Sequence, residues 1–321
     1  MIVEQAFHHL PEILAGNHFP RQDYEGGIVA AFSLALLQEF NSRNALNPLS
    51  LIQCERPYKS KAAYWQNYHD KKKRYLRADL HLNLAPLNLQ NSALSAYGFR
   101  LSNWIEAKFY RAFHKQTGLP KQNTNAPTHT GHLMADLYRL LALVPRSVSK
   151  TNEEKPLGKR RSFAGRYLLH VYSGDVSQHL SLKYRNGQAR TWLDALTNEG
   201  QGSVRGFSTK LEPSTVVSAI GPNLRGLELD LECTNTILVP SFGNRQKLYY
   251  TCILSRIDAF RLTMGDDYWG IKCDGTIESS LNNDFKVFER ISEFVGGRVG
   301  LKDDSEQNSP LPLAQPILEN E

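Results

Sequence analysis

Two segments of this chain alternate between apolar and polar side chains so regularly that they constrain its fold more than any other feature. In RYLRADLHLNL, residues 74–84, leucines and an alanine occupy every second position, and Asp79 lies between them. In NWIEAKFYR, residues 103–111, Glu106 and Lys108 lie between apolar positions. Because successive side chains of a β-strand point to opposite faces, both segments are predicted to be strands with one apolar face and one face that carries charged groups.

Helical and strand patterns around these two segments predict an α/β fold. Residues 24–45 and 132–144 place apolar side chains at intervals of three and four, which is typical of helices that pack one face on a core. Further strands are predicted at residues 49–58 and 166–172. This order of elements predicts a mixed central sheet that helices flank.

The chain is predicted to divide near residue 175. Residues 1–175 would form the α/β domain, in which the polar segment 146–162 is expected to be an exposed loop or hinge. Residues 176–300 are expected to form a strand-rich α+β region for target recognition, dimerisation or docking to a partner. The acidic residues 301–321 are expected to be disordered. The elements predicted in the second half are strands at 223–242 and 247–262 and helices at 189–197 and 282–295.

Length and composition are those of a soluble globular protein with a sizeable core. The 321 residues are 41% hydrophobic and 22% charged, and no apolar run approaches the roughly 18 residues that cross a bilayer. The first residues lack the basic start and small-residue cleavage site of a secretory signal. The four cysteines are far apart and form no CxxC pair, which favours reduced thiols over a zinc ribbon or a disulfide framework. A cytoplasmic protein without membrane contact is therefore expected.

Positive charge is concentrated in one segment. The formal net charge is +6 and the pI is near 9.0, and residues 56–77 alone contain eight Lys or Arg and one acidic residue. A solubilising surface is one interpretation of this segment. A contact surface for the phosphates of a nucleic acid is the other. On the second interpretation, the residues predicted to bind nucleic acid are Lys59, Lys61, Lys71, Lys72, Lys73, Arg74 and Arg77.

The charged faces of the two alternating segments would meet if the strands are neighbours. Asp79, Glu106 and Lys108 then converge, and two carboxylates so close together repel each other unless a cation lies between them. Mg²⁺ prefers oxygen ligands and commonly takes one or two carboxylates together with water and phosphate oxygens. The backbone carbonyl of Ala107 could add a further ligand. A lysine beside the metal would orient the attacking water, help to deprotonate it, or stabilise charge on a phosphate.

Asp79 on one strand, and the EAK tripeptide on the next strand, resemble the motif of the PD-(D/E)XK nuclease superfamily, in which a helix also precedes the sheet. The resemblance implies a restriction-endonuclease-like core in which Asp79 and Glu106 bind Mg²⁺ and Lys108 assists hydrolysis. An acid of the preceding helix often joins the site in that family. Glu25 is preferred to Glu39 for this role, because the glycines that follow it let backbone and metal approach closely. The chain departs from the motif in having RAD where the family has PD.

The resemblance implies a Mg²⁺-dependent DNA endonuclease, with Mn²⁺ as a substitute, of the kind that acts in restriction or antiphage defence. Its partners would be DNA and either a second copy of the chain or a subunit of a defence complex. Two alternatives stay open: a nucleic-acid-binding subunit on a nuclease scaffold that is inactive alone, and a nuclease that acts on RNA. An ordinary ion pair on a sheet face would also account for Glu106 and Lys108.

Histidines and other acids give weaker candidates. His132 and Asp136 lie four residues apart in a predicted helix and could share a metal ion. A local pair between Asp136 and Arg139 is the preferred interpretation. His81 lies two residues after Asp79 on the same strand face, where it could assist the site or belong to an ordinary surface. The sequence contains no Gly-rich phosphate loop.

Overall fold

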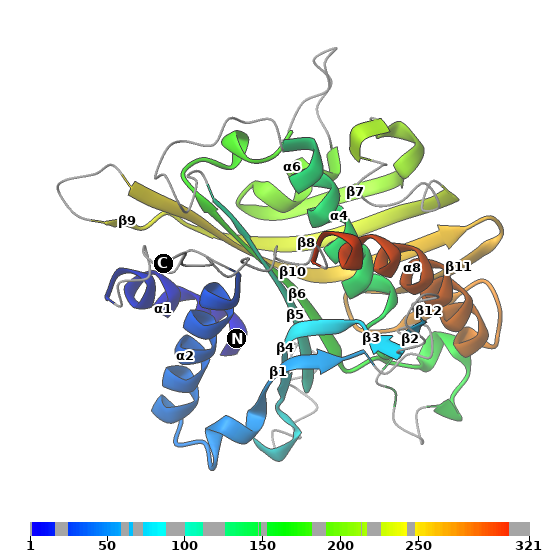
Figure 1. Cartoon of the computed structure of the whole chain (residues 1–321). Coiled ribbons are helices and arrows are strands. Elements are labelled where there is room, and N and C mark those ends of the chain that lie inside the picture. Colours follow the sequence, from blue (N-terminus) through cyan, green and yellow to red (C-terminus); the bar gives the residue numbers. More distant parts are fainter. Residues whose placement is uncertain are drawn as a thin grey trace, which may run out of the picture.

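The computed structural model of the chain is built around one open sheet with helices on both faces (Figure 1). It describes residues 2–16, 25–58, 64–66, 73–87, 100–111, 126–146, 148, 153–181, 191–212, 214–216, 226–242 and 248–307. The predicted α/β class, with a mixed central sheet that helices flank, is therefore confirmed.

In the described part of the chain, the main sheet has ten strands and is largely antiparallel. The strands are β1 (Ile52–Pro57), β4 (Arg77–Asn83), β5 (Ser102–Tyr110), β6 (Ala164–Ser173), β7 (Gly200–Ser208), β8 (Leu227–Leu238), β9 (Ser241–Phe242), β10 (Leu248–Met264), β11 (Asp267–Ile271) and β12 (Ile277–Ser279). Their order is β1-β4-β5-β6-β10-β11-β12, and β10 also pairs with β8 and β9, while β7 pairs with β8. β5 and β6 run parallel. A separate two-stranded sheet consists of β2 (Tyr64–Gln66) and β3 (Lys73–Tyr75).

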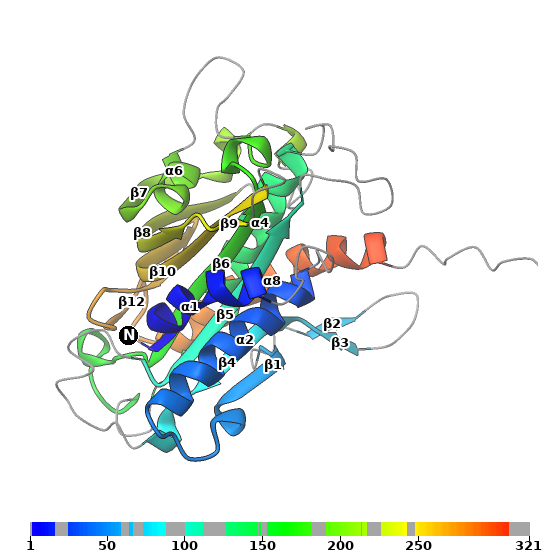
Figure 2. The same ribbon diagram turned by 90° about the vertical axis from the view of Figure 1, so that its left-hand side faces the viewer.

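Helices cover the two faces of the main sheet. The longer helices are α1 (Ile2–Gly16), α2 (Glu25–Ser42), α4 (Ala126–Ala142), α6 (Thr191–Thr197) and α8 (Asp284–Gln307). α1 and α2 pack together on one face (Figure 2), and α4, α6 and α8 lie on the other. Alternate side chains of β5 join the two layers: Ile105 and Ala107 pack in the core with α1 and α2, and Trp104 and Tyr110 pack in the core with α4. None of the helices that the structure describes is long and apolar enough to cross a membrane.

The two alternating segments form neighbouring strands, β4 and β5, as predicted. The helices predicted at residues 24–45 and 132–144 correspond to α2 and α4, and the strands predicted at residues 49–58 and 166–172 correspond to β1 and β6. In the second half, α6, β8, β10 and α8 also lie where the sequence pattern places them. The pattern did not indicate α1, β7, β11 or β12.

Most described residues of the segment 146–162 are exposed, as its polar composition predicts, but two of its arginines contact α8. Arg146 is buried, and it forms an ion pair with Asp284 at the start of α8. Arg160 pairs with the other oxygen of the same carboxylate, at 2.5 Å. Arg146 and Arg160 are therefore structural partners of α8, because the buried carboxylate of Asp284 needs cations.

The second half of the chain is continuous with the first in one sheet. β6, which precedes the boundary predicted near residue 175, pairs with β10, which follows it. α8 continues to Gln307, although disorder is expected from residue 301 onward. Residues 308–321 of the predicted tail lie outside the described residues.

Candidate active site

The candidate site lies where β4 and β5 separate. Their antiparallel pairing ends at Leu80 and Ile105. Beyond this point the next residue of β4 is Asp79, which precedes Leu80 in the chain. Its Oδ2 accepts a hydrogen bond of 2.6 Å from the backbone N–H of Ala107 in β5. The side chain of Asp79 thus takes the place that a backbone carbonyl would have in a continued ladder. This contact holds one carboxylate in the fork between two strands, next to the charged positions of β5.

Glu106 is buried beside Asp79, with 4% of its surface exposed. Its Oε1 accepts a hydrogen bond from the hydroxyl of Tyr58, a residue that directly follows β1. The ring of Tyr58 stacks on Trp104, with 5.5 Å between the ring centroids. Burial, and then the charges of Asp79 and Asp136, raise the pKa of Glu106 well above its ordinary value.

Lys108 connects two helices that lie on opposite faces of the sheet. Its Nζ lies 3.1 Å from Oε2 of Glu25, at the start of α2, and 3.1 Å from Oδ2 of Asp136, in α4. The other oxygen of Asp136 pairs with Arg139 at 3.0 Å. Burial lowers the pKa of Lys108, but Asp136 and Glu25 together raise it by more, so the pKa lies above its ordinary value. Lys108 is therefore a fixed ammonium group.

Four acids form what we call the carboxylate cluster: Glu25, Asp79, Glu106 and Asp136. Burial, and then the charges of Glu25 and Asp136, raise the pKa of Asp79 to about 6, although the hydrogen bond from Ala107 opposes this. Burial also raises the pKa of Glu25 by more than Lys108 lowers it. Burial therefore disfavours the charged forms of these carboxyls, and the charges of neighbouring carboxylates add to this effect.

Buried Glu106 and half-buried Asp79 supply two carboxylates, the donor groups that hard divalent cations prefer. The pKa of each carboxyl is raised by burial and by neighbouring carboxylates, and a cation between the two would offset this repulsion. In the described residues, no group of three or more His, Cys, Asp or Glu side chains is arranged to hold a metal ion. Water and phosphate oxygens would therefore complete the ligand set, as they commonly do for Mg²⁺. The structure brings the N–H of Ala107 to Asp79; a metal contact by its carbonyl stays a prediction.

Of the two candidate acids in α2, the structure brings Glu25 to Lys108. Glu39 lies elsewhere, where it pairs with Arg43 at 2.7 Å. His81, the other candidate on β4, is buried, and its ring nitrogens bond to side chains of the neighbouring strands β1 and β5. These bonds give His81 a structural role in the sheet.

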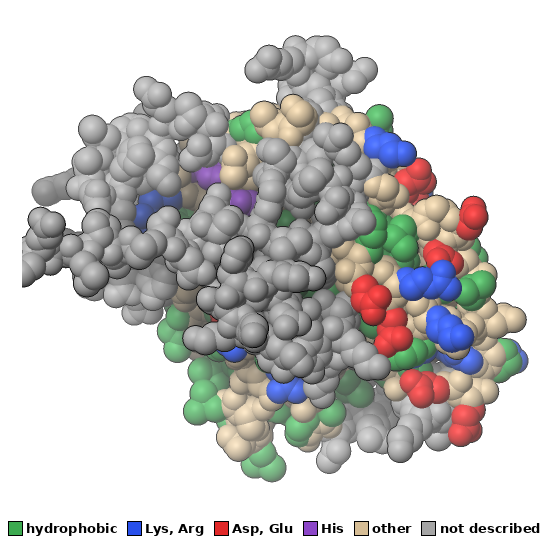
Figure 3. All heavy atoms as spheres, turned by 45° about the vertical axis from the view of Figure 1, so that its right-hand side comes forward, with side chains coloured by type: hydrophobic (Ala, Val, Ile, Leu, Met, Phe, Trp, Pro, Cys, Tyr) green, Lys and Arg blue, Asp and Glu red, His purple; other side chains and the backbone are tan. Residues whose placement is uncertain are grey.

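The basic segment is only partly described. Four of the seven residues predicted to bind nucleic acid lie outside the described residues: Lys59, Lys61, Lys71 and Lys72. Lys73 and Arg74 belong to β3, and Arg77 is exposed at the start of β4. On the face shown in Figure 3, acidic and basic side chains of the described residues are interspersed. A nucleic-acid contact by the basic segment therefore stays a prediction.

The sequence patterns do not indicate two contacts of the site, that of Asp136 with Lys108 and that of Tyr58 with Glu106. The local pair of Asp136 and Arg139 is confirmed, but the same carboxylate also holds Lys108. A signal for this was present, because Asp136 lies on the buried apolar stripe of α4, where an acid needs a cationic partner. Tyr58 carries no such signal, since its contact with Glu106 depends on how β1 and β5 are placed in the sheet.

Comparisons with known proteins give no relative for this chain. No protein-family model matches it, and searches of curated proteins and of solved structures find no similar chain. The functional assignment therefore depends on the residues and geometry of the site.

The raised pKa of Asp79 predicts that the Asp79→Asn variant is more stable than the parent at pH 7. The folded-state pKa of about 6 lies above the ordinary 3.8, so folding favours the protonated carboxyl, and the parent gains stability as pH falls from 7 toward 4. At roughly 1.4 kcal/mol per pKa unit, this corresponds to about 3 kcal/mol. The measurement is urea unfolding of both proteins at pH 7, 6, 5 and 4 without divalent ions. The difference between their free energies of unfolding should shrink as the pH falls. A difference that does not change with pH would contradict this account of the cluster.

Proposed function

We propose that the chain is a Mg²⁺-dependent nuclease that hydrolyses phosphodiester bonds of DNA on a restriction-endonuclease-like core. The observation that carries the proposal is that Asp79 bonds the backbone of β5 at Ala107, between Glu106 and Lys108, at the fork in the sheet. A phosphodiester is an anion, and attack by water increases the negative charge around its phosphorus. A site that combines a fixed ammonium group with two carboxylates suited to a divalent cation can offset that charge.

Each side chain of the site has a distinct role in this proposal. Asp79 and Glu106 would hold the Mg²⁺, which when bound would supply positive charge at the phosphate and lower the pKa of a bound water. Lys108 stays protonated between its two carboxylates, so it stabilises charge on the phosphate and does not act as a base. Asp136 is a positioning residue for Lys108. Glu25 shares this role, and its side chain is 40% exposed, so it can pass a proton from the attacking water to solvent.

One observation supports a second candidate, a nucleic-acid-binding subunit that does not cut alone. The hydroxyl of Tyr58 occupies an oxygen of Glu106 that would otherwise be available to a metal ion. A cation would have to use the other oxygen or displace this contact. If the contact persists and the other oxygen takes no cation, the fork binds no metal, and the chain is restricted to binding.

Cleavage assays distinguish the two candidates. We expect the purified chain to cut plasmid and linear DNA with Mg²⁺ or Mn²⁺, and to stop when EDTA is added. Glu106→Gln should lose cleavage, because the amide cannot supply the negative charge that holds the cation. Glu39→Gln is the matched control, since it removes an acid from α2 outside the carboxylate cluster and should keep full cleavage.

Four results would overturn or change the proposal of a DNA nuclease. Cleavage that continues in EDTA, or that is equal in Glu106→Gln and the parent, would exclude the metal site at this fork. DNA binding without cleavage under either metal would support the binding subunit. Cleavage of RNA with sparing of DNA of the same sequence would keep the site and change the substrate.

A further inference from the structure

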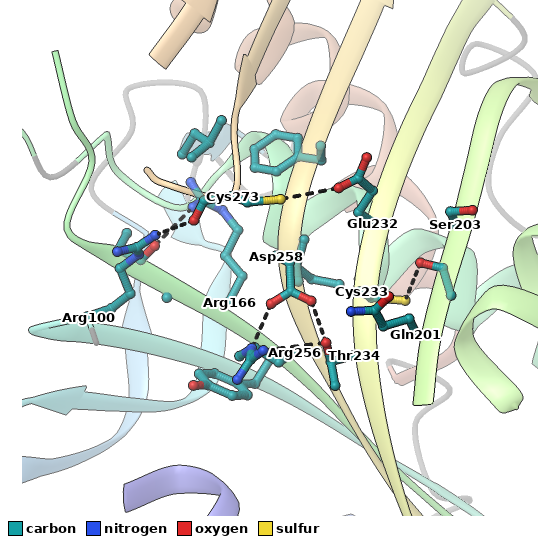
Figure 4. Close-up of a pocket in the computed structure, with 17 residues that line it drawn as sticks. Arg100, Arg166, Gln201, Ser203, Glu232, Cys233, Thr234, Arg256, Asp258 and Cys273 are labelled. Carbon is teal, nitrogen blue, oxygen red and sulfur yellow. Dashed lines mark hydrogen bonds and ion pairs between the residues drawn. The ribbon is translucent and has the colours of Figure 1, made fainter. Parts of the chain in front are cut away.

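A second site lies along β10, at a gap between two strands that share one of its edges. Along this edge, β6 pairs with β10 as far as Arg256, and β11 pairs with β10 from Phe260 onward. Asp258 lies between them, where the pairing of β10 with β8 also shifts register. A cavity of about 530 Å³ opens at this gap (Figure 4). Its volume is within the range of about 300–1,000 Å³ that is usual for pockets that hold small organic ligands.

This cavity is separate from the carboxylate cluster. Glu106 pairs with Leu168 of β6, whereas the cavity is lined by the start of β6, from Ala164 to Tyr167. The two sites share no residue, although the lining of the cavity along β6 ends at Tyr167, one residue before Leu168. A ligand here would not be part of the proposed cleavage site.

The acids of the cavity already have cationic or hydroxyl partners. Asp258 accepts hydrogen bonds from Nε of Arg256 at 2.7 Å and from the hydroxyl of Thr234 at 2.6 Å. Glu232 forms an ion pair with Arg205. These carboxylates are therefore balanced by neighbours on the same sheet face.

The opposite side of the cavity holds two arginines that bond to neutral groups. Nη2 of Arg100 donates to the carbonyl of Cys273 at 3.1 Å. Nε of Arg166 donates to the carbonyl of Leu140 at 2.9 Å, and its guanidinium carbon lies 5.0 Å from the ring centroid of Phe260. Among the residues that the structure describes, neither guanidinium is in ion-pair contact with a carboxylate. Asp274 acts on Arg100 without a direct ion pair, and Nη1 and Nη2 of Arg166 also bond to carbonyls, so an anion in the cavity would find two guanidinium groups without a paired carboxylate.

The surroundings of the cavity lower the pKa of both guanidinium groups. Burial, and then the charge of Arg100, lower the pKa of Arg166 to about 9. Burial also lowers the pKa of Arg100. Arg166 is buried and Arg100 is half-buried, and a buried cation without a paired carboxylate is unfavourable, so an anion that entered the cavity would be stabilised by both groups.

The turn after β11 fixes Arg100 in place. Gly275 has a φ of +84°, which a residue with a side chain rarely adopts. A Cβ at this position would lie 3.2 Å from Nη2 of Arg100 and 3.0 Å from the carbonyl oxygen of Ser162. The glycine therefore leaves the space that the guanidinium occupies at the mouth of the cavity.

We propose that this cavity binds a small organic phosphate, with the phosphate at Arg100 and Arg166 and the rest of the molecule toward Gln201, Ser203 and Thr234. Figure 4 shows the two arginines on one side of the cavity and these three polar side chains on the other. A phosphate monoester can carry two negative charges, which match two guanidinium groups better than one carboxylate does. A bare phosphate ion would leave most of the volume unused, because the polar side chains lie beyond its reach.

Calorimetric titration and thermal unfolding at constant ionic strength test the proposal. The probes are inorganic phosphate, adenosine monophosphate, glucose 6-phosphate, phosphoserine, citrate and adenosine. We expect at least one of the organic phosphates to bind at least tenfold more tightly than inorganic phosphate, and citrate and adenosine to bind more weakly than that compound. Arg100→Ala should weaken its binding at least tenfold, and Arg100→Gln, which keeps a donor for Cys273, should do the same. Gln201→Ala should weaken the binding of the organic phosphate and leave the binding of inorganic phosphate unchanged.

Two controls locate the binding. Arg261→Ala removes an exposed arginine of β10 that pairs with Asp230 outside the cavity, so it should bind like the parent. Lys108→Met should also bind like the parent, because the carboxylate cluster is not involved. The proposal is overturned if no organic phosphate exceeds inorganic phosphate, if citrate binds as tightly, or if both Arg100 variants bind like the parent. None of these readouts depends on cleavage, so they stand whether or not the chain is a nuclease.

Discussion

Replacing Lys108 by methionine is expected to reduce phosphodiester cleavage by about 10²–10³-fold or more, the usual cost of removing one preorganised electrostatic group from a site. Nζ of Lys108 is held at 3.1 Å from both Glu25 and Asp136, so its charge is fixed before substrate arrives. Methionine keeps a similar length and removes the charge. Single-turnover cleavage of a linear DNA with Mg²⁺ measures the effect, and circular dichroism checks that the variant is folded.

Lys108→Arg and Asp136→Asn separate the charge from its placement. Arginine keeps the cation but changes its shape, so it should retain more activity than methionine. Asp136→Asn removes one of the two carboxylates that hold Lys108 and lowers the pKa of the ammonium group. Its cleavage should therefore fall most at high pH, whereas damage to the fold alone would lower it equally at every pH. Full activity of Lys108→Met would reduce Glu25, Lys108 and Asp136 to a structural ion-pair network.

The convergence at the fork could be predicted because it depends on local alternation. β4 and β5 follow each other in the main sheet, and alternation fixes which side chains share a face. Alternation cannot show where pairing stops, and here it stops at Leu80, so that Asp79 bonds the backbone of Ala107. Ala78 also departs from the pattern, since it packs with the α4 core while Leu80 packs with the other core. The contact of Lys108 with Asp136 of α4 depends on how distant segments pack, so the strand pattern could not predict it.

β7 shows why some elements of the second half were missed. Its sequence, GQGSVRGFS, has three glycines and few β-branched residues, a composition that is typical of loops. A Cβ at Gly202 would lie 2.0 Å from the carbonyl oxygen of Ala195, so this strand can pack against α6 only with glycine there. The glycine that argues against a strand in the sequence is thus required by the packing of the strand. Packing of this kind is not visible in a local pattern.

The largest effect on stability is expected from Asp284→Ala, which should lower the free energy of unfolding by about 3–5 kcal/mol. The carboxylate of Asp284 is completely buried, and it pairs with Arg146 through one oxygen and with Arg160 through the other. Removing it leaves two guanidinium groups without their shared anion. Glu153 lies 3.7 Å from Arg146, but its side chain is 52% exposed, so it can replace little of the lost interaction.

Asp267→Ala is the matched control, because Asp267 also ties α8 to the rest of the fold. It pairs with Arg290 at 2.5 Å, but the arginine side chain is 51% exposed. Exposed pairs contribute about 0–1 kcal/mol, so this variant should unfold almost like the parent in urea. The contrast between the two variants tests burial, since both remove one aspartate that pairs with arginine. Equal losses would mean that Asp284 acts as an ordinary surface partner and that residues 146–162 can leave α8 at little cost, as a hinge would.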